Sequence, residues 1–319
     1  MAFLALAFFV LGCEAPGSAV PTSPSAPTGP ASPTAPVPGS TCRVLPKTNV
    51  WNTDISTLPV HAKSDTWLET MGASTTLLHP DFGRSPYGFP FAVVDNTHPT
   101  VSVSFHWPGE SDPGPYPFGP ETPLEGGSDR HAVMINKDTC VLYELYAASW
   151  NNGAPKAGSG AVFALSSNAL RPDTWTSADA AGLPIFPGLV RFDEVKAGVI
   201  RHAVRFTTDL TDCTHIWPAR HDAGTCNSGY PPMGARFRLK ASYDVSGFGA
   251  RARVILTAMK HYGMILADNG THWYFQGTMD SRWTDRLLDQ LKTVPASAFE
   301  AVDESSLMID PDSGQALQP

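Results

Sequence analysis

The chain has 319 residues, of which 42% are hydrophobic and 16% are charged, and its formal net charge is −8. A chain of this length forms one large domain or two closely packed ones, and its hydrophobic content supports a sizeable core and excludes global disorder. The acidic balance argues against nucleic acid as a partner, because neutralising phosphates requires a basic surface.

The N-terminus has the pattern of an export signal. Residues Ala2 to Gly12 are apolar without interruption, which is too short to span a bilayer but typical of a signal-peptide core. Cys13 follows in the order Val10-Leu11-Gly12-Cys13, which resembles the lipobox of bacterial lipoproteins. The resemblance implies a signal peptide at residues 1–12, a lipidated Cys13 as the mature N-terminus, and a lipid anchor in the bacterial cell envelope as the only membrane contact. The alternative is an ordinary signal peptide with a chance cysteine.

A proline-rich segment separates this signal from the body of the protein. Eight of the 28 residues from Glu14 to Thr41 are proline, and most of the others are Ser, Thr, Ala or Gly. Such a composition buries too little apolar surface to fold, so we expect residues 13–41 to be a disordered, semi-stiff tether. The body is expected to be a single mainly-β domain at residues 42–309, followed by a frayed tail at residues 310–319.

Four cysteines remain after Cys13, at positions that suit two disulfides. Cys213 and Cys226 flank a short polar loop and would close it locally, which leaves Cys42 to pair with Cys140. An even number of cysteines in an exported chain favours disulfides, and we favour this pairing among those that four cysteines allow. A zinc site formed by the four thiolates is the alternative, but the chain has no CxxC spacing.

Strand patterns dominate the body. Alternating or apolar strand segments occur, in chain order, at residues 99–107, 131–136, 141–146, 200–207 and 235–240. The second and third of these are expected to form a hairpin. Long loops rich in Gly, Pro and Asp separate the segments.

Helical patterns are few. The spacing of apolar residues predicts short helices at residues 64–71, 252–262 and 281–292. Between the last two, the chain is expected to form a hairpin across Asp268-Asn269-Gly270. Together these patterns predict a mainly-β fold, a β-sandwich or jelly-roll-like architecture with long loops and a few short helices.

The candidate catalytic residues are histidines and carboxylates. The sequence contains no GxGxxG, GxxxxGK[ST], HExxH or GxSxG pattern, which argues against nucleotide binding and α/β-hydrolase chemistry. His131 and His202 lie on apolar strand faces and could act as a base and its orienting partner, with Asp129 fixing the tautomer. Buried structural histidines are the alternative. The carboxylates available for glycoside hydrolysis are Glu125, Asp129, Glu144, Asp179 and Glu194.

Glu144 and a third histidine, His221, carry further expectations. Glu144 alternates with apolar residues along a strand, so we expect it to face a cleft. His221 could join His131 and His202 as a third ligand of a zinc or copper ion. This metal site is the less favoured alternative, and no metal or other cofactor is assigned.

Basic and aromatic residues point to an anionic glycan. Arg236, Arg238 and Lys240 alternate along one strand, and Arg201 and Arg205 along another. Two such basic faces would concentrate uronate, sulfate or phosphate groups, and tryptophans in Gly/Pro-rich stretches suit stacking against sugars. We assign substrate binding to Arg205, Arg220, Arg236, Lys240 and Trp150. The alternative is a solvated sheet face with cross-strand ion pairs.

Two resemblances to known families complete the sequence analysis. The segments EGGSDRHAV, SNALRPDTWTSADAAGLPIFPGLVR and VILTAMKHYGMILADNG resemble a family of exported bacterial proteins, from about Val50 to Val302. This resemblance implies no activity for these residues. The segment Arg238-Leu239-Lys240-Ala241 is similar to a short motif of jelly-roll alginate lyases.

We predict a surface-anchored or exported enzyme that cleaves a polysaccharide or other anionic glycan by hydrolysis or β-elimination. In an elimination, Arg205, Arg236 or Lys240 would neutralise a uronate while His131 or His202 removes the C5 proton. In a hydrolysis, two of the carboxylates would act instead. The alternative is a non-catalytic cell-envelope lipoprotein that binds glycan or has a structural role.

Overall fold

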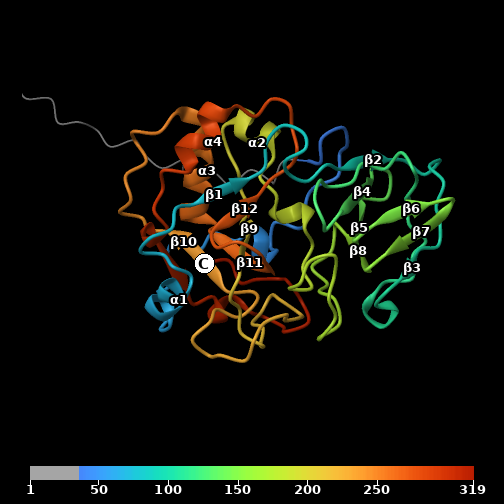
Figure 1. Cartoon of the computed structure of the whole chain (residues 1–319). Coiled ribbons are helices and arrows are strands. Elements are labelled where there is room, and N and C mark those ends of the chain that lie inside the picture. Colours follow the sequence, from blue (N-terminus) through green and yellow to red (C-terminus); the bar gives the residue numbers. More distant parts are fainter. Residues whose placement is uncertain (1–35) are drawn as a thin grey trace, which may run out of the picture. The chain divides into compact units, whose positions relative to one another are not determined.

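The computed structural model describes residues 36–319, and their architecture is mainly β (Figure 1). Within this range the strands form three sheets of six, four and three strands, joined by long loops. The predicted mainly-β fold is therefore confirmed, whereas the sandwich or jelly-roll arrangement stays a prediction. The predicted signal peptide, the lipidated Cys13 and most of the tether lie outside the described residues.

The largest sheet carries the main hydrophobic core. Its strand order is β1-β12-β9-β11-β10-β13, with β1 parallel to β12 and β9 parallel to β11. The strands are β1 (His79–Asp81), β9 (Val204–Thr208), β10 (Arg236–Leu239), β11 (Met264–Asn269), β12 (Tyr274–Gln276) and β13 (Phe299–Val302). The buried rings of Phe206, Phe237 and Trp273 pack together on this sheet.

Two smaller sheets share a second hydrophobic cluster that contains Tyr116 and Phe118. The four-stranded sheet has the order β2-β4-β5-β8, and the three-stranded sheet has the order β3-β7-β6. The strands are β2 (Ala92–Val94), β3 (Ser104–Phe105), β4 (Ala132–Asn136), β5 (Val141–Tyr146), β6 (Ser149–Asn151), β7 (Ala154–Ala157) and β8 (Ser159–Ala164). The antiparallel pairing of β4 with β5 confirms the first predicted hairpin.

The helices are short and pack against the largest sheet or one another. They are α1 (Ser64–Thr70), α2 (Phe192–Ala197), α3 (Ala250–His261) and α4 (Asp285–Leu291), with 3-10 turns at Val50–Asn52, Pro108–Glu110, Phe186–Gly188, Ala296–Ala298 and Ser305–Leu307. The predicted helices correspond to α1, α3 and a shorter α4, and α2 was not expected. After α3, Gly263 has a φ of +67°, and a Cβ there would lie 2.5 Å from the carbonyl oxygen of Phe237, so only glycine fits. No helix within residues 36–319 is long and apolar enough to cross a bilayer.

The second predicted hairpin is wrong. Strands β11 and β12 do not pair with each other, because β9 lies between them and pairs with both. The connection wraps around the end of β9, where Gly270 N–H donates to Thr208 O (3.0 Å) and Trp273 N–H donates to Thr207 O (3.1 Å). An Asn-Gly sequence favours a tight turn, but burying β9 on both edges overrides this local preference.

Both ends of the predicted body differ from expectation. The tail does not fray, because residues 310–319 form bridges to three separate segments and Arg220 Nη2 donates to Asp312 Oδ1 (2.6 Å). At the other end, Val37 is fully buried and its N–H donates to Cys42 O (2.8 Å). The folded body therefore begins inside the predicted tether. Polar composition predicted disorder at both places, but a few long-range contacts are enough to order them.

The two predicted disulfides, Cys42–Cys140 and Cys213–Cys226, are confirmed. Disulfides form and persist in oxidising compartments, so they fit an exported protein.

Replacing Cys42 and Cys140 together by alanine is expected to lower the free energy of unfolding by about 2–4 kcal/mol. This bond joins residues 98 positions apart, so it restricts the unfolded chain more than Cys213–Cys226, whose residues are 13 positions apart. The Cys213→Ala/Cys226→Ala variant is the matched comparison and should lose less. Urea unfolding followed by tryptophan fluorescence measures both losses, and equal losses would contradict the loop-entropy explanation.

Candidate functional site

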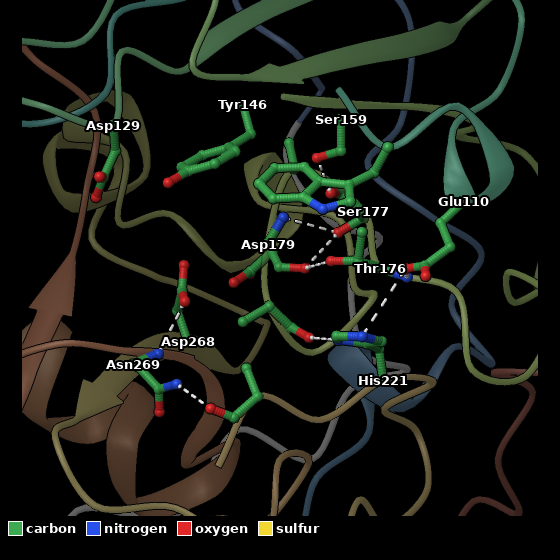
Figure 2. Close-up of a pocket in the computed structure, with 14 residues that line it drawn as sticks. Glu110, Asp129, Tyr146, Ser159, Thr176, Ser177, Asp179, His221, Asp268 and Asn269 are labelled. Carbon is green, nitrogen blue, oxygen red and sulfur yellow. Dashed lines mark hydrogen bonds and ion pairs between the residues drawn. The ribbon is translucent and has the colours of Figure 1, made fainter. Parts of the chain in front are cut away.

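The candidate site is a cavity of about 460 Å³ between the ends of strands from different sheets (Figure 2). Tyr146 ends β5 and Ser159 begins β8, whereas Asp268 and Asn269 end β11. Loop residues 176–180 form one wall of the cavity. The remaining lining residues lie on other loops and are Trp107, Glu110, Asp129, His221 and Ala223.

Two of the lining carboxylates share one buried guanidinium. Arg205 on β9 donates from Nε to Asp179 Oδ2 (3.1 Å) and from Nη2 to Asp179 Oδ1 (2.8 Å). The same Nη2 lies 3.5 Å from Asp268 Oδ2. In Figure 2 the carboxyl group of Asp179 points toward that of Asp268. These contacts of 2.8 Å and 3.5 Å hold Asp179 Oδ1 and Asp268 Oδ2 close together around one nitrogen.

An irregularity in β11 places Asp268 on this face of the sheet. Ile265 pairs with Arg205 and Leu266 with Phe206, but the next pair is Asp268 with Thr207. Regular alternation would put Asp268 on the same face as Leu266, away from Arg205. The extra residue shifts Asp268 to the face of Arg205, as bulges near active sites often do.

Burial raises the pKa of both carboxyl groups of the pair. Burial and the negative charge of Asp179 raise the pKa of Asp268 to about 7. Burial also raises the pKa of Asp179, and the bidentate contact with the Arg205 guanidinium opposes that rise. Asp268 is one-quarter exposed to the pocket, so it is the member of the pair that can hold a proton where a ligand can reach it.

The wall that carries Asp179 is held by buried serines. Ser177 Oγ donates to Leu183 O (2.6 Å) and accepts from Asp179 N–H (2.9 Å). Ser159 Oγ on β8 donates to Ser177 O (2.6 Å). These bonds fix the loop to the four-stranded sheet and fix the direction of the Asp179 side chain.

The open part of the pocket combines an aromatic surface with more acidic groups. Trp107 is 46% exposed and its ring is roughly parallel to that of Tyr146 (28°, centroids 6.2 Å apart). Asp129 is exposed, and Glu110 Oε2 lies 3.8 Å from His221 Nε2. Among the described residues that line the pocket, four are carboxylates and none is lysine or arginine. The pocket therefore suits a neutral or cationic ligand better than an anionic one.

His131 does not act as a free base in this arrangement. The ring lies behind the pocket wall, with Nδ1 bonded to Glu125 Oε2 and Nε2 bonded to Ala178 O (3.0 Å). Both ring nitrogens are occupied, so the predicted partnership with Asp129 does not form here.

His202 belongs to a different buried cluster. Its Nε2 is bonded to Glu194 Oε2 (3.1 Å) and its Nδ1 to Ala203 O (2.7 Å), and Glu194 also accepts from Arg191 Nη2 (2.5 Å). None of these residues lines the described pocket. His131, His202 and His221 are thus not gathered into the three-histidine metal site considered from the sequence, and no group of three or more metal-ligating side chains occurs within residues 36–319.

Glu144 does not face a cleft as predicted. It is fully buried on β5 and accepts hydrogen bonds from the N–H groups of Ile185 (2.9 Å) and Phe186 (2.8 Å). Burial raises its pKa to about 7, and these backbone hydrogen bonds oppose that rise. Alternation showed correctly that Glu144 occupies one face of the strand, but the segment at residues 183–188 covers that face.

The predicted basic groove does not form, because residues 50–58 cover the face of β10 that carries Arg236 and Arg238, and Arg205 is bound to Asp179 and Asp268. Arg236 donates to Val50 O (3.1 Å) and Thr53 O (3.2 Å), and Arg238 donates to Ile55 O (2.8 Å). Sequence alternation indicates which residues share a face and says nothing about what covers it.

The other predicted binding residues also lie outside the pocket lining. Lys240 Nζ donates to Ser297 O (2.9 Å), and Arg220 holds the C-terminal tail. Trp150 lies on β6 of the three-stranded sheet and packs edge-on against Phe118. Of the predicted binding residues, only Arg205 contacts the site, through its ion pairs with Asp179 and Asp268.

Sequence reasoning missed Asp268, Tyr146 and Glu110 as site residues. Asp268 was assigned to a turn, and the bulge that redirects it leaves no clear sequence signal. Tyr146 and Glu110 lie where strands and loops of different sheets meet, which depends on the tertiary fold. Comparisons with protein-family models, with curated proteins and with solved structures found no match to this chain.

Proposed function

We propose that this protein is an exported glycoside hydrolase in which Asp268 is the general acid. The observation that carries this proposal is a pocket-facing aspartate with a pKa of about 7 beside a second carboxyl group that is bound to Arg205. A general acid must be protonated at working pH, and pairs of carboxyl groups with separated pKa values are the usual machinery of glycoside hydrolysis.

The neighbouring residues take complementary roles in this proposal. Asp268 donates its proton to the glycosidic oxygen of the leaving group. Asp129, which is exposed on another side of the pocket in Figure 2, is the second carboxylate and activates the attacking water. Asp179 and Arg205 are buried, so they act as positioning residues that set the protonation of Asp268.

The charge of the pocket favours hydrolysis over β-elimination. Elimination from a uronate needs a cation beside the substrate carboxylate, and the guanidinium of Arg205 is already engaged by two aspartates. The described lining offers no lysine or arginine to a uronate or a sulfated sugar, and it carries Glu110 and Asp129 in addition to the Asp179–Asp268 pair. The proposed substrate is therefore a neutral or amino-bearing polysaccharide, with a sugar ring stacked on Trp107.

The proposed location is the bacterial cell envelope. The disulfides fit export, and the N-terminal pattern supports lipidation of Cys13, with the proline-rich segment as a spacer. Metabolic labelling with a palmitate analogue, compared between the natural chain and Cys13→Ala, tests this point. Equal labelling of the two proteins would contradict a lipid anchor at Cys13.

A polysaccharide screen tests the proposed activity. The purified protein is incubated with neutral, N-acetylated, de-N-acetylated and uronic polysaccharides. New reducing ends without ultraviolet absorption from an unsaturated sugar are expected with the neutral or amino-bearing polymers. Unsaturated products from uronic polymers would instead support elimination, and glycan binding without turnover would support the non-catalytic alternative.

Replacing Trp107 by alanine is expected to raise KM about tenfold while changing kcat little, because a stacking interaction contributes about 0.5–1.5 kcal/mol beyond its buried area. Tyr87→Ala is the matched control, since Tyr87 is 67% exposed and lies outside this pocket. Steady-state kinetics on the best substrate of the screen measures both. An unchanged KM for Trp107→Ala would show that the indole is not part of the binding surface.

A further inference from the structure

The imidazole of His131 joins two walls of the pocket. Its Nδ1 is bonded to the carboxylate of Glu125, which begins the loop 125–130 that carries Asp129. Its Nε2 is bonded to the carbonyl oxygen of Ala178, next to Asp179 in the opposing wall. The ring is 3% exposed, so solvent does not compete for these bonds.

Both partners of this ring are acceptors. A carbonyl oxygen and an ionised carboxylate have no proton to donate, so with Glu125 ionised both ring nitrogens carry hydrogen. A neutral imidazole carries hydrogen on only one nitrogen, and both bonds are made together only by the imidazolium. The hydrogen-bond pattern therefore fits an imidazolium ring at His131 paired with the carboxylate of Glu125.

We propose that His131 is a positioning residue whose doubly protonated ring bonds the loop 125–130 to the loop 176–181, and that loss of its proton removes the bond to Ala178 in the second loop. The effect of these two loops on catalysis rests on the proposed hydrolysis. The dependence of loop order on the protonation of His131 does not rest on it.

The groups around His131 favour its proton. The charged or titratable side chains that face it are Glu125 from its own loop, Glu144 and Tyr146 from β5, Asp179 from the opposing wall, Arg205 from β9 and Asp268 from β11. Most of these groups are acidic, and Arg205 is the one cation among them apart from His131 itself. Burial would lower the pKa of His131, but its hydrogen bond and attraction to Glu125 raise the pKa above its ordinary value.

The sign of the pH dependence follows from these partners. Below the raised pKa of His131 both bonds are present. As pH rises through that pKa, one hydrogen is lost, and the remaining N–H stays with the charged acceptor Glu125 because charge-assisted hydrogen bonds are the stronger ones. The bond to Ala178 O is then the one that breaks, so the wall carrying Asp179 loosens at alkaline pH.

Hydrogen–deuterium exchange of the full protein tests this coupling without any substrate. Protection factors of peptides covering 176–181, corrected for intrinsic exchange, are expected to fall about two- to tenfold across one pH transition. In His131→Gln the same peptides should be poorly protected at every pH. His202→Gln is the matched control, because it removes another buried histidine with two hydrogen bonds that lies outside the pocket.

A second variant keeps the test decisive if His131→Gln does not fold. Glu125→Gln leaves the histidine but removes the charge that holds its proton, so the transition should move to lower pH by about one unit or more. A transition that stays in place in Glu125→Gln, or protection of 176–181 that does not depend on pH in the natural protein, would overturn the proposal. If no polysaccharide is cleaved but the transition behaves as described, the positioning role stands and the proposed hydrolysis fails.

Discussion

Replacing Asp268 by asparagine is expected to reduce kcat for glycan hydrolysis by a factor of about 10²–10⁴, while KM changes little. Asparagine has nearly the same shape but carries no transferable proton, so binding persists and protonation of the leaving group is lost. The contact with Arg205 also survives in neutral form. Steady-state kinetics on the substrate found in the screen measures the loss.

The pH profile adds a second, independent part to this prediction. Because burial and Asp179 raise the pKa of Asp268 to about 7, the natural enzyme should lose activity as pH rises above about 7. Asp285→Asn serves as the control. Asp285 lies on α4 outside the pocket, where it is exposed and forms an ion pair with Arg84. Full activity in Asp268→Asn would remove Asp268 from the mechanism and, with it, the proposed general acid.

Replacing Arg236 by leucine is expected to lower the free energy of unfolding by about 3–5 kcal/mol, because breaking a buried ion pair leaves its partner without compensation. Arg236 is fully buried and contacts Glu304 Oε2 (3.1 Å), Val50 O (3.1 Å) and Tyr262 O (2.7 Å). Burial raises the pKa of Glu304 to about 7 even with the arginine present, so its charged form depends on Arg236. Urea unfolding at pH 8 measures the loss.

Two comparison variants show whether the ion pair is the cause. Lys240→Leu changes the next basic residue after Arg238 on the same chain segment. Its ammonium makes one hydrogen bond at the surface, so the loss should be less than about 1 kcal/mol. Arg236→Leu/Glu304→Leu removes both charges and should recover much of the stability. A double variant as unstable as the single one would assign the loss to the backbone carbonyl contacts instead.

Local patterns predicted the elements that depend on local interactions. Helix α3, the β4–β5 pair and the Cys213–Cys226 disulfide follow from local spacing, and Cys42–Cys140 follows because it is the pair that remains. The site required information of another kind, because Asp268 reaches Arg205 only through a bulge and Glu144 is covered by a segment about 40 residues away. Arg236 and Arg238 show the same limit, since their alternation was read correctly but the cover at residues 50–58 comes from a distant part of the sequence.

The Cys42–Cys140 bond also has a mechanical consequence. Cys42 lies near the start of the folded body, and Cys140 directly precedes β5. Tension applied to the N-terminus passes through the sulfur bridge to the middle strands of the four-stranded sheet, and the intervening chain of residues 43–139 carries none of it. A protein pulled from its N-terminal end would therefore extend by unravelling from residue 141 onward, with the walls built by Trp107 and Asp129 shielded inside the covalent loop.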